Sequence, residues 1–127
     1  MRYLLCLLML LLPLGATAKR ARYPAGSVQI AVVKQVLATS PDPSHQLYDF
    51  TVKCTNLGNK SMRISNNQFY VVDDREQSHL VERARYRDLV QLEAGQSVTL
   101  DRIYIAVPRE RKPKFLYLRG LASCPLR

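Results

Sequence analysis

The sequence predicts an all-β domain, an immunoglobulin-like antiparallel β-sandwich of about seven strands. Short runs rich in β-branched and aromatic residues recur at roughly ten-residue spacing, turn residues separate them, and no stretch has the period of an amphipathic helix. A small closed barrel is the alternative that the same pattern allows. The chain has no tryptophan, so the core Trp that marks true immunoglobulin domains is missing.

The first half of the domain contains the clearest strands. Residues 28–37 are rich in β-branched side chains, and two prolines in the loop 40–44 prevent the strand from continuing. Residues 46–56 alternate at period two, as a half-buried strand does. The apolar face of that strand comprises Tyr48, Phe50, Val52 and Cys54. This alternation points Cys54 into the core.

Shorter elements follow. Residues 62–64 and 68–72 are predicted as strands with a bend between them, and the polar run 73–77 as a hairpin turn. Residues 79–86 are predicted as a charged edge strand, since charge at an edge resists aggregation.

The last third of the chain predicts a long strand, a turn and a short strand. Residues 96–107 change their inward set between Leu100 and Ile103, and such a change of phase indicates a β-bulge. Residues 108–113 form a basic turn, and residues 115–118 form the final predicted strand before a tail that contains Cys124.

Residues 1–18 have the three parts of a secretory signal peptide. Arg2 supplies the positive charge, residues 4–12 are apolar, and Ala16-Thr17-Ala18 is a small-x-small cleavage pattern. The apolar run is shorter than the ~20 residues that span a membrane, although an uncleaved anchor is the alternative. We expect residues 19–26 to be a basic arm, residues 27–127 to be a single domain without a transmembrane segment, and the location to be periplasmic or secreted.

The expected compartment changes the meaning of the cysteines. Cys6 lies in the leader, so Cys54 and Cys124 remain, and a disulfide between them is the default in an oxidising compartment. The bond would close a loop of about 70 residues and stabilise the fold by ~4 kcal/mol. Two free buried thiols are the alternative. Two thiols without a neighbouring histidine do not make a zinc site.

The excess of basic over acidic residues is the feature that most suggests a function. The formal net charge is +9, and the basic residues form three clusters. These are Lys19, Arg20 and Arg22; Arg83, Arg85 and Arg87; and Arg109, Arg111, Lys112 and Lys114. Such clusters attract polyanions, and outside the cytoplasm envelope polymers are expected rather than nucleic acid. The alternative is that the side chains only keep the protein soluble.

No residue pattern predicts catalysis, a metal or a cofactor. His45 and His79 are the only histidines, and both are interpreted as isolated surface residues in polar turns. Asp73, Asp74 and Glu76 fit an ordinary hairpin turn better than a calcium site. No serine lies in a nucleophile elbow, so we expect a protein that is not an enzyme.

Four segments together give a resemblance to a known group. They are Val52 to Lys60, Phe69 to Asp73, Leu92 to Val98 and Ile105 to Pro108. In this order they resemble a family of secreted bacterial immunoglobulin-like β-sandwich domains of unknown function, with its motifs V-x-N-x-G, F-x-L-x-D, L-x-P-G and V-P. Ala94 stands where the family has proline. The resemblance implies an extracytoplasmic binding or structural module, with no catalytic residues.

These observations predict a non-enzymatic binding or structural module. Its partner would be an anionic envelope component or an exported protein, recognised through the basic face and a sheet edge. The alternative is a secreted inhibitor or immunity-type partner of an exported enzyme.

Overall fold

The structure of the protein is a computed structural model that describes residues 26–82 and 89–127. The described part is all-β, as predicted, and every strand pairing in it is antiparallel. The strands are β1 (Val28–Ala38), β2 (His45–Asn56), β3 (Met62–Ser65), β4 (Phe69–Asp73), β5 (Ser78–Leu80), β6 (Leu89–Leu92), β7 (Ser97–Pro108), β8 (Pro113–Leu118) and β9 (Ala122–Pro125).

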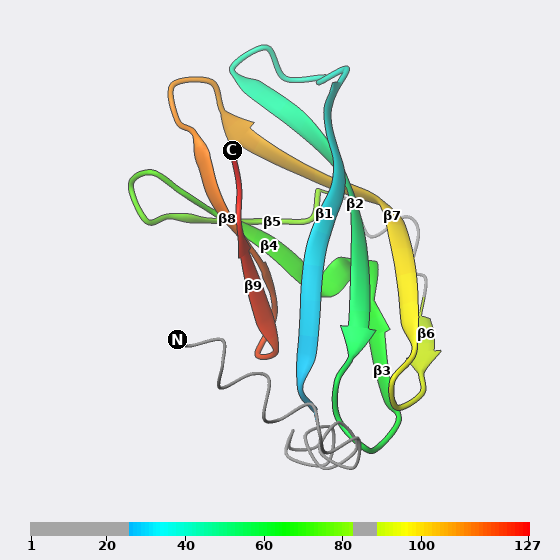
Figure 1. Cartoon of the computed structure of the whole chain (residues 1–127). Helices are drawn as coiled ribbons and strands as arrows, with labels where there is room; N and C mark the ends of the chain where they lie inside the picture. Colours follow the sequence, from blue (N-terminus) through cyan, green and yellow to red (C-terminus); the bar gives the residue numbers. More distant parts are fainter. Residues whose placement is uncertain (1–25, 83–88) are drawn as a thin grey trace, which may run out of the picture.

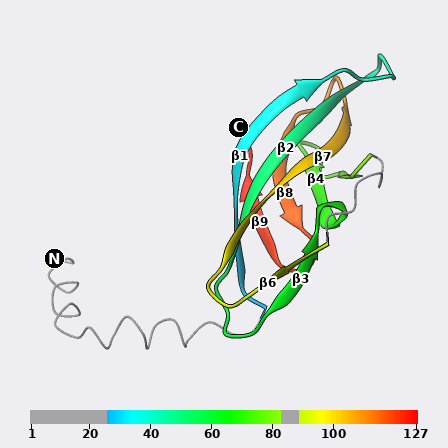
Figure 2. The same ribbon diagram turned by 90° about the vertical axis from the view of Figure 1, so that its right-hand side faces the viewer.

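The strands form three sheets that lie around one core. The first sheet has the order β1-β2-β7, the second β5-β4-β8-β9, and a two-stranded ribbon pairs β3 with β6. The first two sheets face each other in two layers, and the ribbon extends one end of the fold (Figure 1; Figure 2). Each layer therefore has two edge strands.

Alternation of apolar residues places the core between the layers. The side chains of Phe50, Val52 and Cys54 on β2 are fully buried, so the predicted inward face of this strand is confirmed for these three residues. Leu116 and Leu118 of β8 face them from the second layer and are fully buried as well. Burial of such side chains contributes about 1.5–3 kcal/mol each, which is the main favourable term for a domain of this size.

Two bulges bend the long strands. The register of β2 against β7 shifts between Phe50 and Val52, so two β7 residues, Asp101 and Arg102, lie opposite Thr51. This is the bulge that the change of phase between Leu100 and Ile103 predicts. A second shift, not predicted, leaves Val33 as the extra residue of β1.

The structure has more strands than the sequence pattern predicts. Leu89–Leu92 forms β6 and Ala122–Pro125 forms β9. The sequence instead predicts only the entry to a strand and a turn at residues 92–95, and a tail around Cys124. Strand β5 ends at Leu80, and residues 83–88 lie outside the described residues. The tail pairs with β8 because the tight turn at Gly120, which has a φ of +71°, reverses the chain.

The bend between β3 and β4 is one turn of 3-10 helix, Asn66–Gln68. Ser65 caps it, and the Ser65 backbone N–H in turn donates to Gln68 Oε1 at 2.8 Å. In the described ranges, no helix has the length and apolar character needed to cross a membrane.

Candidate functional site

The hairpin between β7 and β8 contains the third predicted cluster of basic residues. Arg111 lies half-buried against Asp73, and the Nε of Arg109 donates to the carbonyl of Pro43 at 2.6 Å. Lys112 and Lys114 are exposed. Two of the four basic residues in this cluster thus make contacts within the fold.

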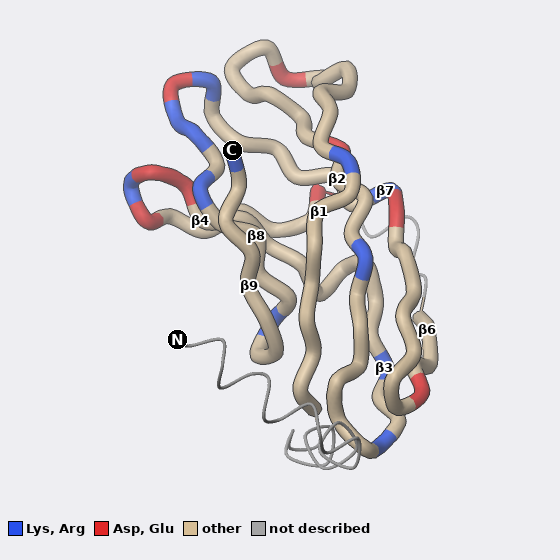
Figure 3. Tube along the Cα trace, viewed as in Figure 1, with Lys and Arg blue, Asp and Glu red and all other residues tan. Residues whose placement is uncertain are grey.

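Charge is also mixed at this end of the molecule. Acidic and basic residues alternate along the β4–β5 and β7–β8 hairpins (Figure 3). The described residues contain twelve Lys or Arg and nine Asp or Glu, so they carry only +3 of the chain's net charge of +9. Arg83, Arg85 and Arg87 lie outside the described residues, as do Lys19, Arg20 and Arg22. The described fold itself is therefore only weakly basic.

Asp73 is the centre of a buried polar cluster. Its carboxylate accepts hydrogen bonds from the backbone N–H groups of Arg75 at 2.8 Å and Gln77 at 3.0 Å, and contacts His79 Nε2 at 2.8 Å and Arg111 at 3.1 Å. Burial raises the pKa of Asp73, but the hydrogen bonds lower it by more, so the carboxyl is held well below its usual range. The cluster joins the β4–β5 hairpin to the β7–β8 hairpin, a structural role.

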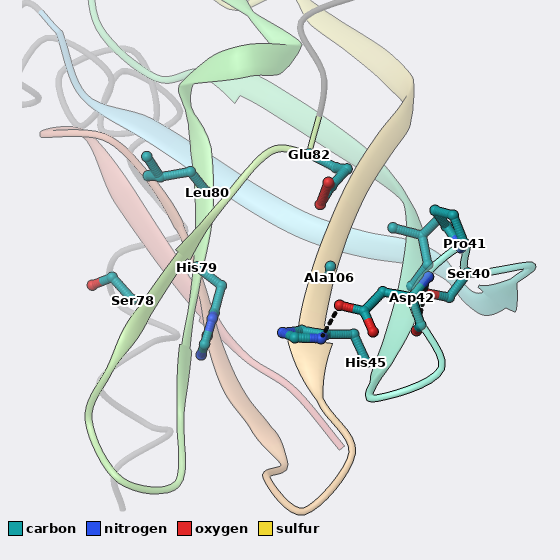
Figure 4. A pocket seen from close by; sticks show the side chains of 10 residues that line it. Ser40, Pro41, Asp42, His45, Ser78, His79, Leu80, Glu82 and Ala106 are labelled. Atoms are coloured by element: carbon teal, nitrogen blue, oxygen red, sulfur yellow. Dashed lines mark hydrogen bonds and ion pairs between the residues drawn. The ribbon is translucent and has the colours of Figure 1, made fainter.

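The two histidines line one cavity, which corrects their interpretation as isolated surface residues. The cavity has a volume of about 400 Å³ and lies between the β1–β2 loop and β5 (Figure 4). Asp42 and Glu82 also line it. His45 and His79 are 34 positions apart in the sequence, so no local pattern could place them at one cavity. They come together because β5 lies against β7.

The side chains around His45 do not form the relay of a serine hydrolase. His45 Nδ1 lies 3.2 Å from Asp42 and 2.9 Å from the Ser44 hydroxyl, so both neighbours share one ring nitrogen. A catalytic relay instead needs the hydroxyl on one nitrogen and the carboxylate on the other. The backbone N–H and the hydroxyl of Ser44 both donate to the Asp42 carboxylate. These hydrogen bonds lower the pKa of Asp42. Within residues 26–82 and 89–127, no three metal-binding side chains cluster closely enough to hold an ion.

The predicted disulfide between Cys54 and Cys124 is absent from the structure, where both thiols are free. Cys54 faces inward on β2, and its neighbour in the register is Ile30 of β1. Ile30 and Cys124 line the same hollow. Burial raises the pKa of the Cys54 thiol to about 11.

We expect the two thiols to react differently. A maleimide reagent should modify Cys124 in the native protein, because that residue is partly exposed, and should modify Cys54 only after unfolding, because a buried thiol of raised pKa has little thiolate. Mass spectrometry of the modified protein measures this. Protection of both cysteines until a reductant is added would contradict the free thiols and indicate the bridge.

A groove runs between β1 and β9, the edge strands of the two layers, which lie side by side (Figure 1; Figure 2). One part of it has a volume of about 540 Å³, and a second part continues it toward the start of β1. Its floor comprises inward side chains of both strands, Ile30, Val32, Cys124 and Leu126. Sequence reasoning missed this groove because the order of strands in a sheet cannot be read from period-two patterns.

The two edges of the molecule differ. At the opposite edge, Val81 forms a bridge with Ile105, and the Glu82 N–H donates to the Tyr104 carbonyl at 2.7 Å, so backbone contacts join the two layers. Between β1 and β9, the described residues make no backbone hydrogen bond. The groove is therefore an open seam of the fold.

An apolar surface also covers the outside of the second sheet. The rings of Tyr70 and Tyr117 stack with centroids 5.1 Å apart, and Phe115 lies 6.3 Å from Tyr117. Tyr70 and Tyr117 are directly opposite each other on β4 and β8, and such a cross-strand aromatic pair stabilises a sheet by about 0.2–1 kcal/mol. Phe115 lies on the same strand as Tyr117.

Comparison of the chain with models of protein families, with curated proteins and with solved structures found no match in any of the three.

Proposed function

We propose that this chain is a non-enzymatic binding module that works outside the cytoplasm and recognises a protein partner at the edge strand β1. The observation that carries the proposal is the open seam between β1 and β9. An edge strand with unpaired backbone groups is a template for pairing with another chain, and proteins usually cover or blunt such edges.

Exposed apolar side chains on β1 support the same surface. Val33 is 60% exposed, Leu37 58% and Val36 41%, and all three lie on this strand. Only three other large apolar residues in the described part are exposed to this degree. Apolar residues concentrated on one edge favour a partner surface over a purely solvated one.

The fold and the location are parts of this proposal. We interpret the two facing antiparallel layers as an immunoglobulin-like sandwich, in keeping with the resemblance of the turn motifs. The leader pattern of residues 1–18 supports export to the periplasm or the cell exterior. An inhibitor or immunity-type protein would be a particular case, in which the partner is an exported enzyme.

An anionic envelope component is the second candidate, and the distribution of charge favours it only outside the described fold. If residues 19–22 and 83–87 bind such a polymer, binding to vesicles with anionic lipids should weaken steeply with salt. Co-sedimentation at increasing salt concentration measures this. Binding that does not change with the salt concentration would exclude an anionic envelope component as the ligand.

Site-specific photocrosslinking tests the partner proposal. A benzophenone amino acid at Val33, expressed in the cells that make the protein, should give a discrete crosslinked product in the envelope fraction. The matched control carries the same group at Leu89, which is equally exposed at 61% but lies on β6. Equal products from both positions, or none from Val33, would refute recognition at β1.

A further inference from the structure

The backbone of β1 faces the groove at three positions. Leu57 N–H donates to Ser27 O at 2.8 Å, which makes these residues a hydrogen-bonded pair of the β1–β2 ladder. Hydrogen-bonded and non-hydrogen-bonded pairs alternate along an antiparallel ladder. The N–H and C=O groups of Val28, Ile30 and Val32 therefore point away from β2, toward the seam.

Strand β9 offers less backbone to a partner. Leu126 N–H donates to Lys114 O at 2.7 Å, so by the same alternation Ser123 and Pro125 are the residues whose backbone points away from β8. Proline has no N–H to donate. A strand that enters the groove would consequently pair with β1, and β9 would act as a wall.

The side chains around the groove define what fits in it. Its floor is apolar, and its charged lining residues are Lys34 and Arg127, both at the end nearest the β1–β2 loop. Among the residues that the structure describes, no Asp or Glu lines either part of it. A strand added to β1 turns every second side chain toward the floor and the others toward solvent.

Resting on the proposed function, we infer that the occupant is an extended segment of a partner protein that adds antiparallel to β1. The segment has apolar residues at alternate positions and an acidic residue at its N-terminal end. Antiparallel pairing is the slightly more stable arrangement, and it brings that end of the segment to Lys34. Backbone hydrogen bonds to Val28, Ile30 and Val32 provide affinity, and the apolar floor and Lys34 provide selectivity.

A labelled peptide tests the inference on the full mature chain. The probe has nine residues, with aspartate first and then alternating valine and threonine, and its ends are acetylated and amidated. We expect saturable binding by fluorescence polarisation, weakened at least about fivefold by Lys34→Glu. Lys60→Glu makes the same charge change at an exposed turn residue that does not line the groove, and should leave binding unchanged.

Two N-methylated probes test the backbone pairing itself. Methylation of alternate amides on one edge of the peptide removes the donors that meet β1, and on the other edge it removes donors that β1 does not use. The probe methylated on the edge that meets β1 should lose at least about tenfold in affinity, and the probe methylated on the other edge should bind like the parent peptide.

No binding of the parent probe up to millimolar concentration, or equal loss from both methylated probes, would overturn strand addition. If the probes fail while the Val33 crosslink forms, the proposed partner recognition stands and this inference is wrong. If the probes bind as expected while Val33 gives no crosslink, the groove is selective but the recognition of a cellular partner at β1 is refuted.

Discussion

Replacing Asp73 with alanine is expected to lower the free energy of unfolding by about 3–5 kcal/mol, as measured by urea denaturation. The side chain of Asp73 is fully buried, and its carboxylate is the acceptor shared by Arg111, His79 and two backbone N–H groups. Its removal leaves the half-buried guanidinium and the buried donors without their partner, which is why the loss exceeds that of a surface ion pair.

The effect of this substitution should depend on pH. The hydrogen bonds that hold the pKa of Asp73 below its ordinary value of 3.8 stabilise the ionised form in the folded state. The stability that this carboxylate contributes is therefore fully present above the unfolded pKa and is lost as the pH falls toward the lower folded pKa. The difference between wild type and Asp73→Ala should be constant near neutral pH and shrink below about pH 4.

The neighbouring residue provides the control. Asp74 is exposed and accepts one long hydrogen bond, from the Lys112 N–H at 3.3 Å, so Asp74→Ala should cost less than about 1 kcal/mol. A similar loss from both variants, or a difference that grows as the pH falls, would mean that the Asp73 cluster does not stabilise the fold in the way described.

Replacing Asn56 with alanine should cost about 2–4 kcal/mol in the same measurement. Asn56 is fully buried at the end of β2, and its side chain donates to the carbonyls of Lys60 at 2.8 Å and Leu92 at 3.0 Å. Its Oδ1 accepts from the Gly58 N–H at 2.9 Å. Alanine removes the side-chain partner of three backbone groups, two of which are in buried hydrogen bonds, and removes the bond between β2 and the β3–β6 ribbon.

Asn59→Ala is the matched control for Asn56, because Asn59 is an exposed residue of the same turn. This variant should change the unfolding free energy by less than about 0.5 kcal/mol. If Asn56→Ala is equally mild, the three hydrogen bonds are not essential to the turn.

The sequence motifs single out Asn56 and Asp73, but they do not show what the two side chains do in the fold. Asn56 and Asp73 are the Asn and Asp of the segments that resemble the family motifs. Asn56 is predicted as the last residue of a strand, and Asp73 as the first residue of a hairpin turn. Both are buried, and their side chains bond backbone groups of other residues: Asn56 bonds the carbonyl of Leu92 in β6, and Asp73 the N–H of Gln77 in the β4–β5 turn. The long-range partners, Leu92 and Arg111, could not be foreseen because each lies more than 30 residues away in the sequence.

Period-two alternation predicts strands where a strand has one buried face. It therefore located β2 and the bulge of β7, whose inward residues change phase. It did not predict β6 and β9, where Leu92 is the one buried residue of the two strands and no fully buried face shows the alternation. The candidate groove depends on which strands end up at the edges of the two sheets, and a pattern within a single strand does not contain that information.

Charge clusters in the sequence do not show which basic side chains also connect parts of the fold. Arg109 and Arg111 form part of the third cluster, yet one holds the β1–β2 loop and the other the buried Asp73. An arginine has five donors, so it is as useful for joining two loops as for binding a ligand. Spacing alone does not distinguish these roles.

Amide hydrogen exchange at β1 tests recognition at the open seam most directly. In the free protein, the amides of Val28, Ile30 and Val32 should exchange rapidly, while those of Gln29 and Ala31, which bond to β2, should be protected. Addition of the nine-residue acidic peptide should slow the first three by at least about tenfold. Unchanged rates in the presence of bound peptide would contradict strand addition at β1.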